Sequence, residues 1–316
     1  MKVILGGDTH GDRNQVRWLL DKAIKHDAAG VFVLGDFGIF CHIDAGAFTA
    51  GVAVDAARKG LKIWFLPGNH ENYDLLERVE EEHPRDDDGF VIYHDGLSSL
   101  LYSPRGHRWS WDGVSFLSLG GAYSVDKYWR IAADGMTVTH AEAVAKRGHS
   151  LNAKEKYVLQ HPHYRWWPQE EITDEQAASA AAGAPVDVML AHDKPIAAHL
   201  DWNRKDIPEA EHNQRRLQRV VDAVKPQLYL HGHFHYAYTD WLPKTMTSVC
   251  GLDCDPEASK DTGGSGDRKL SWGVLDLGDA SYGFTRQLAD GTEKRWAFIP
   301  YETRVLNEDE GDSAPQ

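Results

Sequence analysis

Five short apolar runs, each ending at a polar residue able to bind a metal ion, constrain this 316-residue chain more than any other feature. The runs are continuous rather than alternating, which is typical of strands buried on both faces of a sheet. A buried strand that ends in a carboxylate, an imidazole or an amide carries a desolvation cost, and a bound cation offsets that cost. The five runs read KVILGGDTHGD, GVFVLGDFG, LKIWFLPGNHE, VDVMLAHDKP and PQLYLHGHFH.

Helical patterns lie between these runs, over residues 14–27, 44–59 and 211–225. The alternation of strand and helix predicts parallel crossovers, in which functional groups collect at the carboxyl ends of the strands. The stretch 89–126 reads differently, with short segments such as GFVIYHDG and GVSFLSLGG that are broken by Gly and Asp. We expect it to form a second, more antiparallel sheet. Three later segments are expected to continue that sheet: HGHFHYAYTDW, KTMTSVCG and SWGVLDLG.

The motif-bearing strand ends run from Asp8 to His235, so we expect one domain over residues 1–304 rather than two. Residues 134–165 have helical tendency but no motif, and we interpret them as an insertion. Residues 305–316 are rich in acidic and small residues, a composition that predicts a disordered tail.

Composition limits the partners and the compartment. No apolar run approaches the roughly 18 to 20 residues that a membrane helix needs. Met1 leads directly into a strand, and three scattered cysteines fit a reducing compartment, so we expect a cytoplasmic protein in which Cys250 and Cys254 are buried apolar residues. The net charge of −14 disfavours a nucleic-acid polymer as partner, but it permits a small phosphorylated substrate, with a nucleotide favoured.

Polar residues with metal-binding atoms follow all five runs. Taken singly, each is explained as a helix cap or as a hydrogen-bonded histidine. Together they over-supply one ion but suit two ions that share a carboxylate, an arrangement that hydrolyses phosphate esters with a bridging hydroxide. Their mixed ligation admits Mn²⁺, Fe, Zn²⁺ or Mg²⁺, of which Mn²⁺ is the first choice. The set comprises Asp8, His10, Asp36, Asn69, His70, His192, His233 and His235.

The motifs GDTHGD, GDFG, GNHE, AHD and GHFH, in this order over about residues 1–240, resemble those of the calcineurin-like metallophosphoesterases. The resemblance implies an α/β fold, a four-layer α/β/β/α sandwich of two mixed sheets flanked by helices, with a dinuclear metal centre. More loosely, PRGHRW, LGGAYSVDK and WWPQEEIT look like segments of bacterial and phage members.

The same resemblance assigns roles to single residues. His70 corresponds to a histidine that does not bind metal but stabilises the transferring phosphoryl group or protonates the leaving oxygen. Glu71 is expected to steady its loop, and His231 to pack beside the ligands. The implied first ion is bound by Asp8, His10 and His235, the second by Asn69, His192 and His233, and Asp36 bridges the two.

The second motif departs from that of the protein serine/threonine phosphatases in this superfamily, which continues to an Asp and then to Arg-Gly. Here Ile39 and Phe40 stand in those places, which argues against a phosphoprotein phosphatase and leaves the partner of His70 unidentified. Surface ion pairing is the alternative role for each arginine among the candidate phosphate contacts. These contacts are His42, Arg105, His107 and Arg130.

The leading hypothesis is therefore a phosphodiesterase that acts on nucleotides or other small phosphodiesters. A phosphomonoesterase or a nuclease with the same metal centre is the alternative, because the walls of the pocket rather than the ions distinguish these substrates. A non-catalytic binding module is the remote alternative, since such a protein usually lacks some of the metal ligands that are present here.

Overall fold

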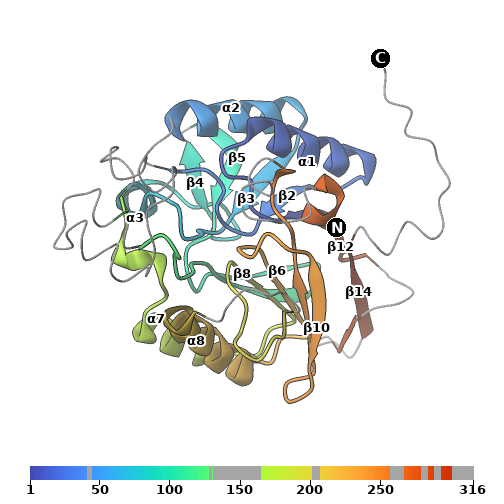
Figure 1. Ribbon diagram of the computed structural model, residues 1–316. Coiled ribbons are helices and arrows are strands. Elements are labelled where there is room, and N and C mark those ends of the chain that lie inside the picture. Colours follow the sequence, from blue (N-terminus) through green and yellow to red (C-terminus); the bar gives the residue numbers. More distant parts are fainter. Residues whose placement is uncertain are drawn as a thin grey trace.

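The structure is a computed structural model that describes residues 1–40, 45–94, 96–127, 130, 165–200, 207–256, 267–278, 284–287 and 293–300. In this part of the chain two mixed sheets lie face to face, and helices cover the outer face of each (Figure 1). The α/β/β/α fold expected from the resemblance is thereby confirmed.

The first sheet has eight strands in the order β13-β14-β12-β1-β2-β3-β5-β4. The four central strands β1, β2, β3 and β5 pair in parallel. On either side of them, β4, β12, β13 and β14 pair antiparallel with their neighbours. The strands are β1 (Lys2–Gly6), β2 (Gly30–Val33), β3 (Lys62–Phe65), β4 (Val91–His94), β5 (Leu97–Tyr102), β12 (Trp272–Asp276), β13 (Phe284–Gln287) and β14 (Glu293–Pro300).

The second sheet has six strands in the order β10-β11-β9-β8-β7-β6. Its four central strands pair in parallel, and β6 and β10 pair antiparallel at the edges. The strands are β6 (Arg108–Trp111), β7 (Val114–Leu119), β8 (Val188–Ala191), β9 (Leu228–His231), β10 (Tyr238–Leu242) and β11 (Thr247–Gly251).

Helices α1 (Arg13–Lys25), α2 (Ala45–Arg58) and α3 (Tyr73–Glu82) pack on the first sheet, and α7 (Asp174–Ala181) and α8 (Pro208–Val224) on the second (Figure 1). Two short 3-10 helices are η1 (Pro168–Glu170) and η2 (Arg268–Ser271). The Asp12 side chain caps the first turn of α1 by accepting a hydrogen bond from the main-chain N–H of Asn14. Helix α8 begins at Pro208 and ends where Lys225 turns left-handed before Pro226. The three helices predicted from apolar periodicity are confirmed within a few residues of their ends.

Alternate residues of the first-sheet strands serve two different cores. Ile4 of β1 packs under the helices, whereas Val3 and Leu5 face the second sheet. Trp64 of β3 likewise faces the second sheet. Since both faces of each strand are covered by apolar layers, both sets of residues must be apolar, and the continuous runs in the sequence result.

Two predictions about the sheets were wrong. SWGVLDLG forms β12, which pairs with β1 in the first sheet, and GFVIYHDG forms β4, which pairs with β5 there. The second sheet is parallel at its centre rather than mainly antiparallel. A short apolar segment does not reveal which sheet it joins, because either one offers a buried position with unpaired main-chain groups.

The domain boundaries stay predictions. Of the insertion predicted at residues 134–165, only residue 165 is described, and the tail predicted at 305–316 lies outside the described residues. Within the described ranges no helix has the length and apolar character that a bilayer crossing requires. Cys250 and Cys254 are free and buried, as predicted, and Cys41 falls outside the described ranges.

Asp55 on α2 links α1 to α2, because its carboxylate accepts hydrogen bonds from Nε of Arg13 at 2.7 Å and Nε of Arg17 at 2.8 Å. The bond from Arg13, opposed by burial and supplemented by Arg17, lowers the pKa of Asp55 to about 2. A carboxylate whose folded-state pKa is lowered stabilises the fold above its unfolded-state pKa near 4, and that contribution is lost as the pH falls toward 2.

Asp55→Asn is therefore expected to lower the free energy of unfolding by about 1 to 2 kcal/mol at pH 7, a value reduced by water around the two partly exposed arginines. Urea unfolding between pH 7 and pH 3 checks this, and the difference from wild type should shrink below pH 4. Asp21→Asn, which removes an exposed pair with Lys59, is the control and should change stability by less than about 0.5 kcal/mol. A loss for Asp55→Asn that is independent of pH would contradict the interpretation.

Candidate metal centre

The predicted ligands all lie in loops that leave the carboxyl ends of parallel strands. Asp8 and His10 follow β1, Asp36 follows β2, and Asn69 follows β3 in the first sheet. In the second sheet His192 follows β8, and His233 and His235 follow β9. Because the two sheets face each other with these strand ends at a common edge, the structure brings all seven side chains together.

Two overlapping groups have atoms close enough to share an ion. The potential ligand atoms of Asp8, His10 and His235 lie within 4.8 Å of one another, and so do those of Asp8, Asp36 and His192. Oδ2 of Asp36 lies 3.7 Å from Nε2 of His10 and 3.5 Å from Nε2 of His192. Asp36 therefore stands between the imidazoles of the two groups.

Three potential ligand atoms, one each from His192, Asn69 and Asp36, converge in a way that requires a proton or a metal ion between them. Nδ1 of His192 lies 2.7 Å from the main-chain oxygen of Leu34 and donates a hydrogen to it. The lone pair of Nε2 then points toward Oδ1 of Asn69 at 3.0 Å and Oδ2 of Asp36 at 3.5 Å, both of which are acceptors. Only a proton or a metal ion between these atoms satisfies all three, so the residues present fit a divalent cation.

The electrostatics of the site lead to the same conclusion. Burial would raise the pKa of Asp8, but His192 and His235 outweigh it and lower that pKa to about 2. Burial would lower the pKa of His192, but Asp36 and Asp8 outweigh it and raise that pKa to about 10. Two ionised carboxylates buried side by side thus demand positive charge, which histidines supply here and which divalent ions would supply more fully.

The ligand loops are held in an uncommon backbone conformation. Four of the eight non-glycine residues with positive φ in the described chain are candidate ligands, namely His10 at 45°, Asp36 at 46°, His233 at 70° and His235 at 53°. The left-handed region costs such residues about 1 kcal/mol or more each, so surrounding contacts must enforce it. Backbone strain of this kind gathers at functional sites.

Glycines before the ligands allow neighbouring loops to approach closely. A Cβ atom at Gly68, before Asn69, would stand 2.1 Å from Oδ1 of Asp36. A Cβ atom at Gly232, before His233, would stand 2.1 Å from Oδ1 of Asp8. Each of these glycines therefore makes room for a ligand from a different strand, which explains why the motifs read GN and GH.

A model of the calcineurin-like phosphoesterase family matches residues 1–237, the part of the chain that carries every one of these ligands. The chain belongs to the calcineurin-like phosphoesterase family. It is accordingly a metal-dependent phosphoesterase, and its Asp and His side chains form the groups that could bind the divalent ions used by this family.

Solved structures show more distant likenesses to this phosphoesterase. A dimetal phosphatase from Danio rerio is 11% identical, with 95% of this chain and 99% of that chain covered, at a TM-score of 0.46. A protein from Thermus thermophilus is 10% identical, with 80% and 89% covered, at a TM-score of 0.44. An archaeal phosphodiesterase is 11% identical, with 95% and 100% covered, at a TM-score of 0.38. No curated protein matches the sequence.

One important residue of the phosphoesterase was missed in the sequence. Oδ2 of the buried Asp255 lies 2.7 Å from Nδ1 of His10, and the main-chain N–H of Asp255 donates to the main-chain oxygen of Asp8. A carboxylate on the far nitrogen of a ligand histidine orients the ring and makes it a better ligand. A signal existed, because VCGLDCD repeats the pattern of an apolar strand followed by acidic residues.

Glu71 joins the loops that carry Asp36 and Asn69. One carboxylate oxygen accepts from the main-chain N–H groups of Phe37 and Gly38, and the other accepts from that of Gly68 at 2.6 Å. This arrangement agrees with the expectation that Glu71 steadies its loop. His231 lies beside the site, where Nε2 is 2.8 Å from the hydroxyl of Tyr238.

His70 is brought to the same site without joining either group of ligand atoms. Its main-chain N–H donates to Oδ1 of Asp36 at 2.9 Å, and its ring lies 6.0 Å from that of Phe40. Burial, opposed by Asp36 and assisted by Arg130, lowers the pKa of His70 to about 4. The ring is therefore neutral at pH 7 and offers one N–H donor and one acceptor.

Three of the four residues predicted to contact phosphate make contacts with other parts of the described chain. Arg105 donates to the main-chain oxygen of Gly120 and to the Tyr73 hydroxyl, and Arg130 pairs with Glu170. The His107 ring packs against Phe90 and Trp109, with centroid separations of 4.6 and 5.2 Å. His42 lies outside the described residues.

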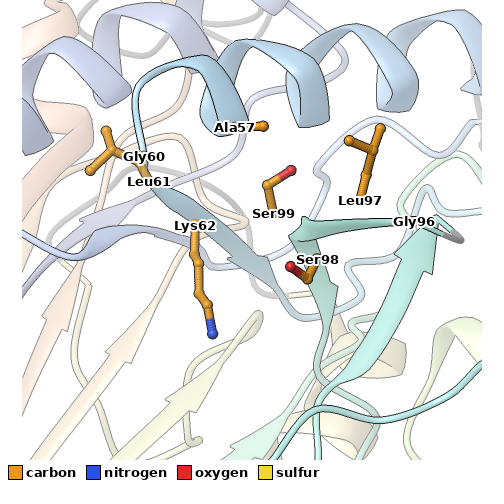
Figure 2. A pocket seen from close by; sticks show the side chains of 8 residues that line it. All are labelled: Ala57, Gly60, Leu61, Lys62, Gly96, Leu97, Ser98 and Ser99. Atoms are coloured by element: carbon orange, nitrogen blue, oxygen red, sulfur yellow. The ribbon is translucent and has the colours of Figure 1, made fainter.

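A shallow hollow of about 300 Å³ lies elsewhere, lined by residues 57, 60–62 and 96–99 (Figure 2). Lys62 and Leu97 in its lining are the first residues of β3 and β5. The hollow therefore lies at the amino ends of these parallel strands, away from the edge where the candidate ligands gather.

If His10 is a ligand, Asp255→Asn is expected to weaken Mn²⁺ binding about 10- to 100-fold at its site, because the ring loses its charged acceptor. Calorimetric titration of metal-stripped protein checks this. Asp174→Asn is the control, since that exposed carboxylate on α7 pairs with Arg216 and Arg219 on α8. Equal Mn²⁺ affinities in wild type, Asp255→Asn and Asp174→Asn would show that Asp255 does not contribute to metal binding.

Proposed function

We propose that the protein is a phosphodiesterase that hydrolyses nucleotides or other small phosphodiesters at a centre of two divalent ions. The observation that carries this proposal is the convergence of five predicted ligand side chains around the two buried carboxylates of Asp8 and Asp36, with His70 beside them. When bound, such ions lower the pKa of a water molecule and offset the negative charge of the phosphate.

In this proposal Asp8, His10 and His235 hold the first ion, and Asn69, His192 and His233 hold the second. Asp36 serves both, which its position between the imidazoles of His10 and His192 supports. Oxygen and imidazole ligands in this mixture suit Mn²⁺, with Fe, Zn²⁺ and Mg²⁺ as alternatives.

Phe40 supports a diester as the substrate. Its ring is buried and lies 6.3 Å from the ring of His10 and 6.0 Å from that of His70. At neutral pH a phosphomonoester carries more negative charge than a diester and gains more from a neighbouring cation. The protein serine/threonine phosphatases of this superfamily have an arginine at this place. The apolar ring of Phe40 offers no positive charge to a phosphomonoester. The net charge of −14 in turn favours a small substrate over a polynucleotide.

His70 acts on the substrate in this proposal rather than on the metal ions. Its N–H group hydrogen-bonds the phosphoryl oxygens or the leaving oxygen, and the bond from its main chain to Asp36 keeps the ring beside the ligands. Such assistance contributes most when the leaving group is a poor one, such as a ribose hydroxyl.

Two ions per chain are expected by elemental analysis after reconstitution with Mn²⁺. Asp36→Asn should weaken both sites, whereas His10→Ala should weaken mainly one, because a carboxylate shared by two cations offsets their charge at both. Calorimetric titration distinguishes the variants. A fully active protein with one ion, or equal single-site losses in the two variants, would rule out the bridged pair.

The substrate class is tested by a panel of phosphomonoesters, linear diesters, polynucleotides and 2′,3′- and 3′,5′-cyclic nucleotides, with Mn²⁺ added after chelation. Diesters should be hydrolysed fastest, and faster monoester turnover would favour a phosphatase instead. On the same panel His70→Ala should keep both ions and lose about 10² to 10⁴ in turnover on cyclic nucleotides.

The loss should be smaller on a bis-nitrophenyl diester, because nitrophenolate departs with little help from a hydrogen bond, and KM should change less than kcat. Equal losses on both substrates would place His70 at the phosphoryl oxygens rather than at the leaving oxygen. An unchanged rate would remove it from the reaction.

A further inference from the structure

A buried chain of hydrogen bonds leads from Asn69 away from the candidate ligands. Nδ2 of Asn69 donates to the Ser124 hydroxyl at 2.9 Å, and this hydroxyl donates to Oε2 of Glu170 at 2.5 Å. Glu170 in turn forms a two-point ion pair with Arg130, with distances of 2.7 and 2.5 Å. All four residues are at most 2% exposed.

The buried ion pair of Arg130 and Glu170, at the end of this series of hydrogen bonds, carries a large desolvation cost. Removing both charges from water costs more than their attraction returns unless every remaining donor and acceptor is satisfied. Here they are largely satisfied, since Glu170 also accepts from the main-chain N–H of Trp167, and Arg130 donates to Asp126 and to the main-chain oxygen of Arg165. Two apolar side chains in place of Arg130 and Glu170 would stabilise the fold to a similar extent. The two charges therefore point to a role other than packing.

The positions of the hydrogens identify that role. A serine hydroxyl has one hydrogen, and an ionised carboxylate can only accept. The hydrogen of Ser124 therefore goes to Glu170 at 2.5 Å rather than to the main-chain oxygen of Asn69 at 3.5 Å. Ser124 must then accept from the amide NH₂ of Asn69, which directs Oδ1 of Asn69 toward Nε2 of His192, 3.0 Å away.

Arg130 favours this direction of the hydrogen bonds because it stabilises the ionised form of Glu170. Burial raises the pKa of Glu170 to about 7, and the ion pair and hydrogen bonds from Arg130 oppose that rise. A neutral carboxyl group at this place could donate to Ser124, which would then donate to Asn69. The amide would turn over and present its NH₂ group, which cannot bind a cation, to the metal centre.

We propose that Arg130 and Glu170 are positioning residues that act through Ser124 to present the amide oxygen of Asn69 to the second ion. This inference rests on the proposed function, in which Asn69 binds that ion. It also gives a role to two sequence segments that the five motifs leave unexplained, since Ser124 lies in LGGAYSVDK and Glu170 in WWPQEEIT.

Calorimetric titration of the metal-stripped full-length protein with Mn²⁺ tests the proposal. Ser124→Ala should weaken one of the two ions about 10-fold or more and leave the other within about twofold. Glu170→Gln should give a similar loss, because an amide can donate to Ser124 and reverse the chain. The double variant should lose no more than the larger single loss, since both changes break one chain.

Ser103→Ala is the matched control. Ser103 is a buried serine whose hydroxyl lies 2.7 Å from that of Ser118, so the variant removes the same atom from the core. It should leave both Mn²⁺ affinities unchanged. A loss of thermal stability in Ser124→Ala with both affinities intact would show that the chain only supports the fold, and would overturn the proposal.

The wild-type titration separates this inference from the proposed function. Two ions in wild type with equal affinities in Ser124→Ala and Ser103→Ala would overturn the positioning role alone. Fewer than two ions in wild type would overturn the dinuclear centre and the positioning role together.

Discussion

Burial of Asp8 and Asp36 side by side is the constraint on which the rest of the site depends. Two carboxylates shielded from water repel each other, and each must be offset by positive charge or by N–H donors. The fold supplies imidazoles from both sheets, together with main-chain N–H groups of His70 and His233 that donate to Asp36 and Asp8. Because five strand ends must reach the same small volume, the loops contain residues with positive φ and glycines at the points of closest approach.

The fold class was predicted correctly from the sequence, and the structure brings the predicted ligand residues to one edge, because each motif is local and each strand ends where its motif begins. The sequence could not predict which sheet a strand joins, as β4 and β12 show, since both faces of these strands are apolar whichever sheet they enter. Asp255 and Glu170 were missed for a different reason. Asp255 meets His10 across 245 residues of chain, and Glu170 meets Ser124 across 46. The acidic residues after the apolar run VCGL could have marked Asp255 as a candidate, but no local pattern identifies the partner of either carboxylate.

The arginines had two possible roles in the sequence. Arg105 and Arg130 were candidate phosphate contacts, with surface ion pairing as the alternative. In the structure Arg105 ties the loop after β7 to α3 and to the segment at Glu170, and Arg130 pairs with Glu170 itself. Both arginines therefore hold main-chain segments around the metal centre, in the way that Glu71 holds the loops of Asp36 and Asn69.

The region that defines the family is shorter than the region that completes the site. The family match ends at residue 237, yet β11 lies beside β9, β12 pairs with all five residues of β1, and Asp255 follows β11. A chain growing on the ribosome would therefore release every candidate metal ligand before it releases β11 and β12, the strands that pair with β9 and β1. Until those strands arrive, His10 lacks its carboxylate and the central strand of the first sheet has an exposed edge. The contact between Asp255 and His10 thus forms only late in synthesis.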